Sequence, residues 1–141
     1  MGKGRKGVAS VAHMVWVLLV GCLGQTHYSK GDLYELGKGD DPKLEIIVAD
    51  KVGEGPHCRD YGQGCRGAFM VKHRGLTFIC VQYEGPKEAL RFARFIDAYV
   101  VRNWLLDDVA GEPVLEEFVE RAFKARRPGL SRKEAALRGQ I

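Results

Sequence analysis

Short apolar runs separated by glycine-rich loops make up the middle of the chain. Residues 44–49 are apolar and β-branched, which predicts a strand. Residues 50–67 contain so many glycines that we expect a loop there. Two further strands are predicted at residues 68–72 and 76–83, joined by a tight turn. The second of them is apolar on both faces, so we expect it to lie centrally in a sheet.

Two amphipathic helices are predicted after these strands. Pro86 suits the first position of a helix, and apolar residues then recur at helical spacing through Phe92. Residues 99–106 predict one strand, or two strands with a bend between them. Pro113 opens the second helix, whose apolar face includes Phe118. We expect both phenylalanines to be buried against the sheet.

This order of elements predicts an α+β fold. We expect a small two-layer sandwich, in which an antiparallel sheet of about four strands is covered by two helices, ferredoxin-like in the loose sense. The domain is expected to span residues 44–125. Residues 22–43 show no sustained period, so we expect a flexible tether. Residues 126–141 are basic and are expected to form a disordered tail.

The first 21 residues have the layout of a secretory signal. A short basic stretch precedes an apolar run over residues 8–20, which ends in a small residue, Gly21. The run is shorter than the roughly 20 residues of a membrane-spanning helix. His13 within the run is unusual for a signal. A signal without lipidation and a cytosolic N-terminal helix therefore stay open as alternatives.

The end of the apolar run, Leu19-Val20-Gly21-Cys22, resembles the lipobox of bacterial lipoproteins. The resemblance covers residues 1–22 only. It implies cleavage after Gly21 and attachment of diacylglycerol to the Cys22 thiol, whose acyl chains anchor the protein in a membrane. Leu23 follows the cysteine, which resembles an outer-membrane rather than an inner-membrane address. The implied location is therefore the periplasmic face of a bacterial membrane.

The charge distribution and the absence of known motifs exclude several classes of function. The 141 residues include 22 basic and 18 acidic side chains, and the basic excess lies at the two ends of the chain. A nucleic-acid-binding domain concentrates positive charge in its folded part, so we expect no nucleic-acid partner. The sequence has no phosphate-binding loop, dinucleotide fingerprint or zinc-protease motif. We expect no cofactor. The sequence does not decide whether the protein is an enzyme, although the missing motifs favour a protein without catalytic activity.

Three cysteines remain after Cys22. In the oxidising compartment of an exported protein, we expect a disulfide between Cys58 and Cys65, and a buried free thiol at Cys80. Another pairing and the absence of any disulfide stay open as alternatives. A metal site is a further alternative, because zinc takes four nitrogen or sulfur ligands. Its candidate ligands are His57, Cys58, Cys65 and His73.

A second loop carries the carboxylates Asp107, Asp108 and Glu112. They could ligate a hard cation or act as an acid and base pair. The favoured interpretation is structural, because a helix N-terminus stabilises negative charge. We therefore expect a lipid-anchored, non-catalytic binding or accessory domain of the cell envelope that holds a protein partner. The alternative is a small envelope enzyme or metal-binding protein that uses one of the two loops.

Overall fold

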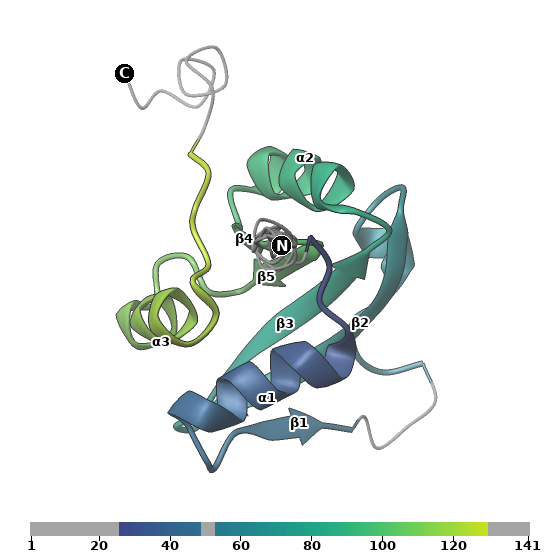
Figure 1. Cartoon of the computed structure of the whole chain (residues 1–141). Helices are drawn as coiled ribbons and strands as arrows, with labels where there is room; N and C mark the ends of the chain where they lie inside the picture. Colours follow the sequence, from purple (N-terminus) through teal and green to yellow (C-terminus); the bar gives the residue numbers. More distant parts are fainter. Residues whose placement is uncertain (1–25, 49–52, 130–141) are drawn as a thin grey trace, which may run out of the picture.

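In a computed structural model of the chain, residues 26–48 and 53–129 are described. A five-stranded antiparallel sheet lies at the centre, in the order β1-β2-β3-β5-β4 (Figure 1). The strands are β1 (Glu45–Ile47), β2 (Cys65–His73), β3 (Leu76–Tyr83), β4 (Tyr99–Val101) and β5 (Trp104–Asp107). The helices are α1 (Lys30–Asp40), α2 (Pro86–Ile96) and α3 (Pro113–Phe123), with a short 3₁₀ helix, η2 (Cys58–Asp60).

The sheet confirms several predictions from the hydrophobic pattern. β3 is central, because it pairs with β2 on one side and with β5 on the other. The apolar stretch at residues 99–106 forms two strands that turn at Arg102 and Asn103. Arg74 and Gly75 both have positive φ, at 48° and 82°, and form the two-residue turn between β2 and β3. The fold is therefore α+β with an open antiparallel sheet.

Helices cover both faces of this sheet. Neighbouring strand residues alternate between two cores: Cys80 and Leu106 pack with α1 and α3, whereas Val81 and Leu105 pack with α2. Figure 1 shows the same separation of α2 from the other two helices. The expected two-layer sandwich with two helices is therefore wrong, and with it the loosely ferredoxin-like arrangement.

Helix α1 lies within the segment for which we expected a flexible tether, so that expectation is wrong for residues 30–40. Ser29 caps the helix. Its hydroxyl accepts a hydrogen bond from the Asp32 amide at 3.1 Å, and the Asp32 carboxylate accepts one from the Ser29 amide at 2.8 Å. This reciprocal pair satisfies two donors that the first turn leaves unpaired.

Tertiary packing stabilises α1. Leu33 and Gly37 are buried on the side that meets α3. At the end of the helix, Asp40 accepts two hydrogen bonds from the Arg121 guanidinium, at 2.6 and 2.8 Å. Glycines lower helix propensity by about 1 kcal/mol each relative to alanine, which is why the local pattern pointed to a tether. Contacts with α3 outweigh that local preference.

The residue before this cap, Tyr28, is held against the turn between β4 and β5. The Tyr28 amide donates to the Asn103 side-chain oxygen at 2.7 Å, and the Asn103 side-chain nitrogen donates to the Tyr28 carbonyl at 3.2 Å. The Trp104 indole donates to the same carbonyl at 2.9 Å. Asn103 is buried, so these bonds satisfy an amide that water cannot reach.

The expected disordered tail is ordered at its beginning. Arg126 pairs with Val100 at the outer edge of β4 through two backbone hydrogen bonds of 2.8 and 3.0 Å. The Arg127 guanidinium donates two hydrogen bonds to the Asp97 carboxylate, at 2.9 and 2.6 Å. The prediction of disorder is therefore wrong for these residues. The remainder of that predicted tail, from residue 130, and the predicted signal lie outside the described residues.

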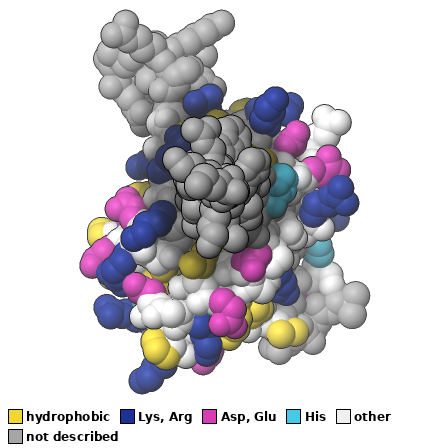
Figure 2. All heavy atoms as spheres, viewed as in Figure 1, with side chains coloured by type: hydrophobic (Ala, Val, Ile, Leu, Met, Phe, Trp, Pro, Cys, Tyr) yellow, Lys and Arg dark blue, Asp and Glu magenta, His cyan; other side chains and the backbone are white. Residues whose placement is uncertain are grey.

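The two phenylalanines expected in the core differ in burial. Phe118 of α3 is fully buried, as predicted. Phe92 of α2 is only half-buried, because it lies at the margin of its core beside exposed Phe95. The described surface facing the viewer in Figure 2 carries basic and acidic side chains interspersed with each other.

Candidate functional site

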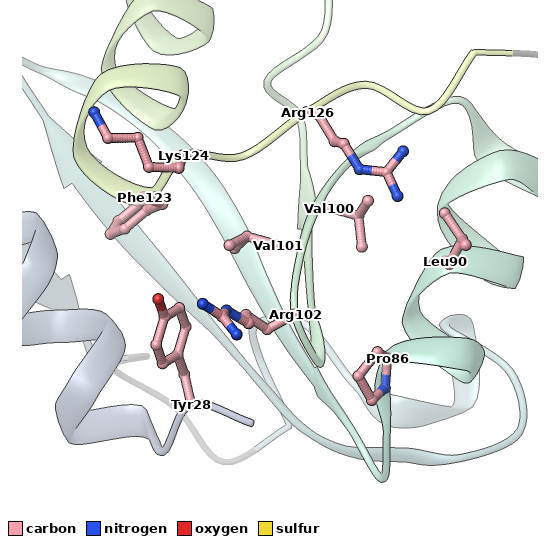
Figure 3. A pocket seen from close by; sticks show the side chains of 9 residues that line it. All are labelled: Tyr28, Pro86, Leu90, Val100, Val101, Arg102, Phe123, Lys124 and Arg126. Atoms are coloured by element: carbon pink, nitrogen blue, oxygen red, sulfur yellow. The ribbon is translucent and has the colours of Figure 1, made fainter. Parts of the chain in front are cut away.

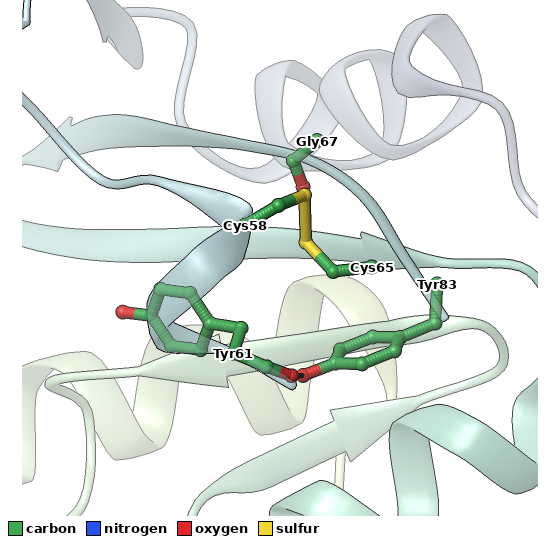
Figure 4. Close-up of a disulfide and its surroundings, with 5 residues drawn as sticks. All are labelled: Cys58, Tyr61, Cys65, Gly67 and Tyr83. Carbon is green, nitrogen blue, oxygen red and sulfur yellow. Dashed lines mark hydrogen bonds between the residues drawn. A yellow bond between two sulfur atoms is a disulfide. The ribbon is translucent and has the colours of Figure 1, made fainter. Parts of the chain in front are cut away.

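The loop before β2 is closed by a disulfide between Cys58 and Cys65, whose Cα atoms lie 5.4 Å apart (Figure 4). The Tyr83 hydroxyl donates to the Tyr61 carbonyl at 2.6 Å, and both tyrosines are buried. Cys80 is a free, buried cysteine, and burial raises the pKa of its thiol well above the ordinary value. These findings match the expected states of all three cysteines.

The candidate metal ligands are used in other ways. Both thiols that would bind the ion are joined in the disulfide. His57 contacts the Gly53 carbonyl through its ring at 3.0 Å. His73 Nδ1–H donates to the Asp41 carboxylate at 2.7 Å, and its ring stacks on Phe118 with centroids 3.9 Å apart. Among residues 26–48 and 53–129, no group of three or more metal-ligating side chains is arranged around a common point.

The acidic loop also holds the fold together. Asp107 accepts a hydrogen bond from the Tyr61 hydroxyl at 2.8 Å, and burial together with this bond raises the pKa of the phenol. The Asp108 amide donates to the other Asp107 oxygen at 2.9 Å. Burial, then the neighbouring Asp107 charge, raises the pKa of Asp108. Glu112 is the N-cap residue of α3, and its side chain makes no capping bond. Asp107 thus connects the sheet to the disulfide loop.

A pocket of about 320 Å³ lies at the edge of the sheet, around β4 (Figure 3). We call it the edge pocket. Its walls come from α2 on one side, from the end of α3 on another, and from the residue that precedes the cap of α1. The walls and floor consist of Tyr28, Pro86, Leu90, Val100, Val101 and Phe123. The three remaining lining residues are cationic: Arg102, Lys124 and Arg126.

The position of each of these three cations is determined by the backbone element that carries it. Arg102 stands in the β4–β5 turn with φ of 53°, and its guanidinium lies 5.1 Å from the Tyr28 ring centroid. Lys124 ends α3 with φ of 58°. Arg126 is placed by its paired backbone contact with Val100.

Within the described part of the chain, no carboxylate forms an ion pair with any of these three cations. The next residue, Arg127, shows the contrast, because Asp97 binds its guanidinium with two hydrogen bonds. The edge pocket therefore combines an apolar floor with three cations that form no ion pair with a described carboxylate. Such a site can bind an anionic group attached to an apolar one.

Comparison with protein-family models, with curated proteins and with solved structures found no match. The edge pocket and the two loops are therefore interpreted from their own chemistry. In the described ranges, no helix has both the length and the apolar character needed to cross a membrane. Cys22, the predicted lipidation site, lies outside these ranges.

The edge pocket was not predicted from the sequence pattern. Its residues come from four separate segments, and the segments that contain Tyr28 and Arg126 were expected to be flexible. One signal was present: Arg102 lies between two short apolar runs, where a turn exposes its side chain. In the sequence, the charge of Lys124 suits the negative end of a helix dipole, and the charge of Arg126 suits a solvated tail, so neither residue alone indicates a binding site.

Proposed function

We propose that this chain is a lipid-anchored, non-catalytic binding domain on the periplasmic face of a bacterial membrane, with the outer membrane favoured. It attaches to the membrane through Cys22 and holds a protein partner of the envelope at the edge pocket. The observation that carries the binding role is the group of three cations around an apolar floor, none of which pairs with a carboxylate of residues 26–48 or 53–129.

The states of the cysteines support export. Disulfides form and persist in oxidising compartments, and Cys58 and Cys65 are joined in one. Cys80 is buried in the core, where it acts as a small apolar side chain. Cys22 is the remaining cysteine of the four, and it stands at the position where the lipobox resemblance places the acylated residue.

The hydrogen bonds of the two loops favour binding over catalysis. Asp107 is engaged by the Tyr61 hydroxyl and by the Asp108 amide. The cysteines of the other loop are joined to each other. In both loops these groups stabilise the fold, whereas the cations of the edge pocket have no such structural partner among the described carboxylates.

Replacing Cys22 tests the anchor. Cys22→Ser removes the thiol that accepts the diacylglycerol, so we expect loss of fatty-acid labelling and loss of signal cleavage in cells fed an alkyne fatty acid. Cys80→Ala is the matched control, since its thiol is buried and its removal should leave labelling intact. Undiminished labelling of Cys22→Ser would contradict the proposed anchor.

A further inference from the structure

We infer that the edge pocket recognises an acidic peptide segment of the partner, with one apolar side chain seated on its floor and carboxylates bound by the surrounding cations. This inference rests on the proposed binding function and adds to it the chemistry of the ligand. Three observations carry it: the backbone conformation of two cations, the directions in which the cations point, and the charge of the neighbouring helix.

Two of the cations occupy backbone positions where glycine would be easier to accommodate. Arg102 and Lys124 both have φ in the left-handed region, at 53° and 58°. A residue with a Cβ is strained there, and glycine is not. Glycine is also the usual residue after the end of a helix, where Lys124 stands. Strained residues that persist in a fold favour a functional role for their side chains.

The other left-handed non-glycine residues of the described ranges do not line the edge pocket. Asp97 and Asp108 belong to a residue type that tolerates this conformation. Arg74 stands in the two-residue turn between β2 and β3, outside the edge pocket. Arg74 has the same charge and conformation as Arg102 without lining the pocket, which makes it a natural control.

The cations are spread around the floor and do not converge on one point. In Figure 3 the Arg126 guanidinium lies beside Val100, and the Arg102 guanidinium points towards Tyr28. The Lys124 ammonium points away, along α3. Because the three charged groups point in different directions, a chain that carries several carboxylates matches them better than a single phosphate or carboxylate does. The intervening apolar side chain of such a chain would then lie over Val100 and Val101.

The neighbouring helix adds to the positive charge. Of the charged residues in α2, three are basic and one is acidic: Lys87, Arg91 and Arg94 against Glu88. This helix supplies Pro86 and Leu90 to the pocket wall. A segment entering along α2 therefore meets positive charge before it reaches the floor, which favours an acidic partner and opposes a basic one.

The experiment measures binding of a fluorescein-labelled probe peptide, Glu-Glu-Leu-Phe-Glu-Glu, to the detergent-extracted full-length protein by fluorescence anisotropy. We expect binding that weakens when the glutamates are replaced by lysine, or the Leu-Phe pair by serine. Arg102→Gly and Lys124→Gly should each weaken binding about 1.5- to fivefold, the usual range for an exposed ion pair. Their melting temperatures should change little, because glycine adopts positive φ without strain, and in Arg102→Gly this gain offsets the lost contact with the Tyr28 ring.

Arg74→Gly is the matched control, and it should leave probe affinity unchanged. Equal weakening by Arg74→Gly would overturn the inference, because the attraction would then follow total charge and not the pocket. Short-chain phosphatidylglycerol is tested as a second ligand. If Arg102→Gly weakens binding of this lipid but not of the peptide, the ligand is a lipid and the inference is wrong. Failure of the probe leaves the Cys22→Ser labelling result unaffected, so the anchor and the ligand are tested separately.

Discussion

At the scale of single residues, Phe118 lies at the centre of the larger core. Its ring stacks on His73 and makes edge contacts with Phe78 and Phe123. Phe118→Ala should lower the free energy of unfolding by about 3–5 kcal/mol, because it leaves a cavity among residues that cannot collapse into it. Phe92→Ala should cost about 1–2 kcal/mol, because this side chain is only half-buried. Urea unfolding measures both, and equal costs would contradict the assignment of the cores.

Asp41 links stability to pH. Burial raises the pKa of this carboxyl, but the hydrogen bond from His73, the amide of Lys43 and the charges of His73 and Arg74 outweigh it. The pKa therefore lies below its ordinary value of 3.8. The carboxylate stabilises the fold above that value, and the contribution is lost as pH falls through the lower folded-state pKa.

The pH dependence of unfolding tests this residue. In urea titrations from pH 7 down to about pH 3, the wild type should lose stability below the ordinary aspartate pKa. Asp41→Asn should be less stable at neutral pH and should lose less on acidification, because its amide does not titrate. An identical acid slope in the wild type and in Asp41→Asn would show that this carboxyl is not the group responsible.

At the scale of elements, two glycines of α1 distinguish a packed helix from a tether. A Cβ at Gly37 would collide with Leu44 and approach the Phe123 ring to 3.2 Å, and both side chains are buried. A Cβ at Gly39 meets nothing within 4 Å. Gly39→Ala should therefore stabilise the protein by up to about 1 kcal/mol through helix propensity.

Gly37→Ala should lower the melting temperature despite the same gain in propensity, because α1 must move away from Leu44 and Phe123. Thermal unfolding followed by circular dichroism compares the two variants directly. If both substitutions stabilised the protein, or neither changed it, α1 would not pack as described.

The elements that the sequence predicted are those with strong local patterns. β3 is apolar on both faces, and α2 and α3 each begin at a proline, so periodicity and turn chemistry identified them. Helix α1 was missed because its stability depends on contacts with α3. The edge pocket was missed for a related reason: Tyr28 and Arg126 reach it only through hydrogen bonds to residues distant in sequence. Local patterns do not encode such contacts.

At the scale of the whole molecule, the ends of the described chain meet the sheet edge that carries the edge pocket. Tyr28 is held by Asn103 and Trp104, and Arg126 pairs with Val100. The segment that leads from the proposed anchor therefore ends beside the proposed binding site. A partner bound there would be held close to the point at which the domain is connected to the membrane.

The proposed function requires that the protein is exported, is acylated at Cys22 and contains one disulfide. The intact mass of the membrane-extracted protein tests all three requirements together. We predict the mass of residues 22–141 with diacylglycerol on Cys22, less two hydrogens for the bond between Cys58 and Cys65. The unprocessed chain of 15.7 kDa, with four free thiols and no lipid, would contradict the proposed function.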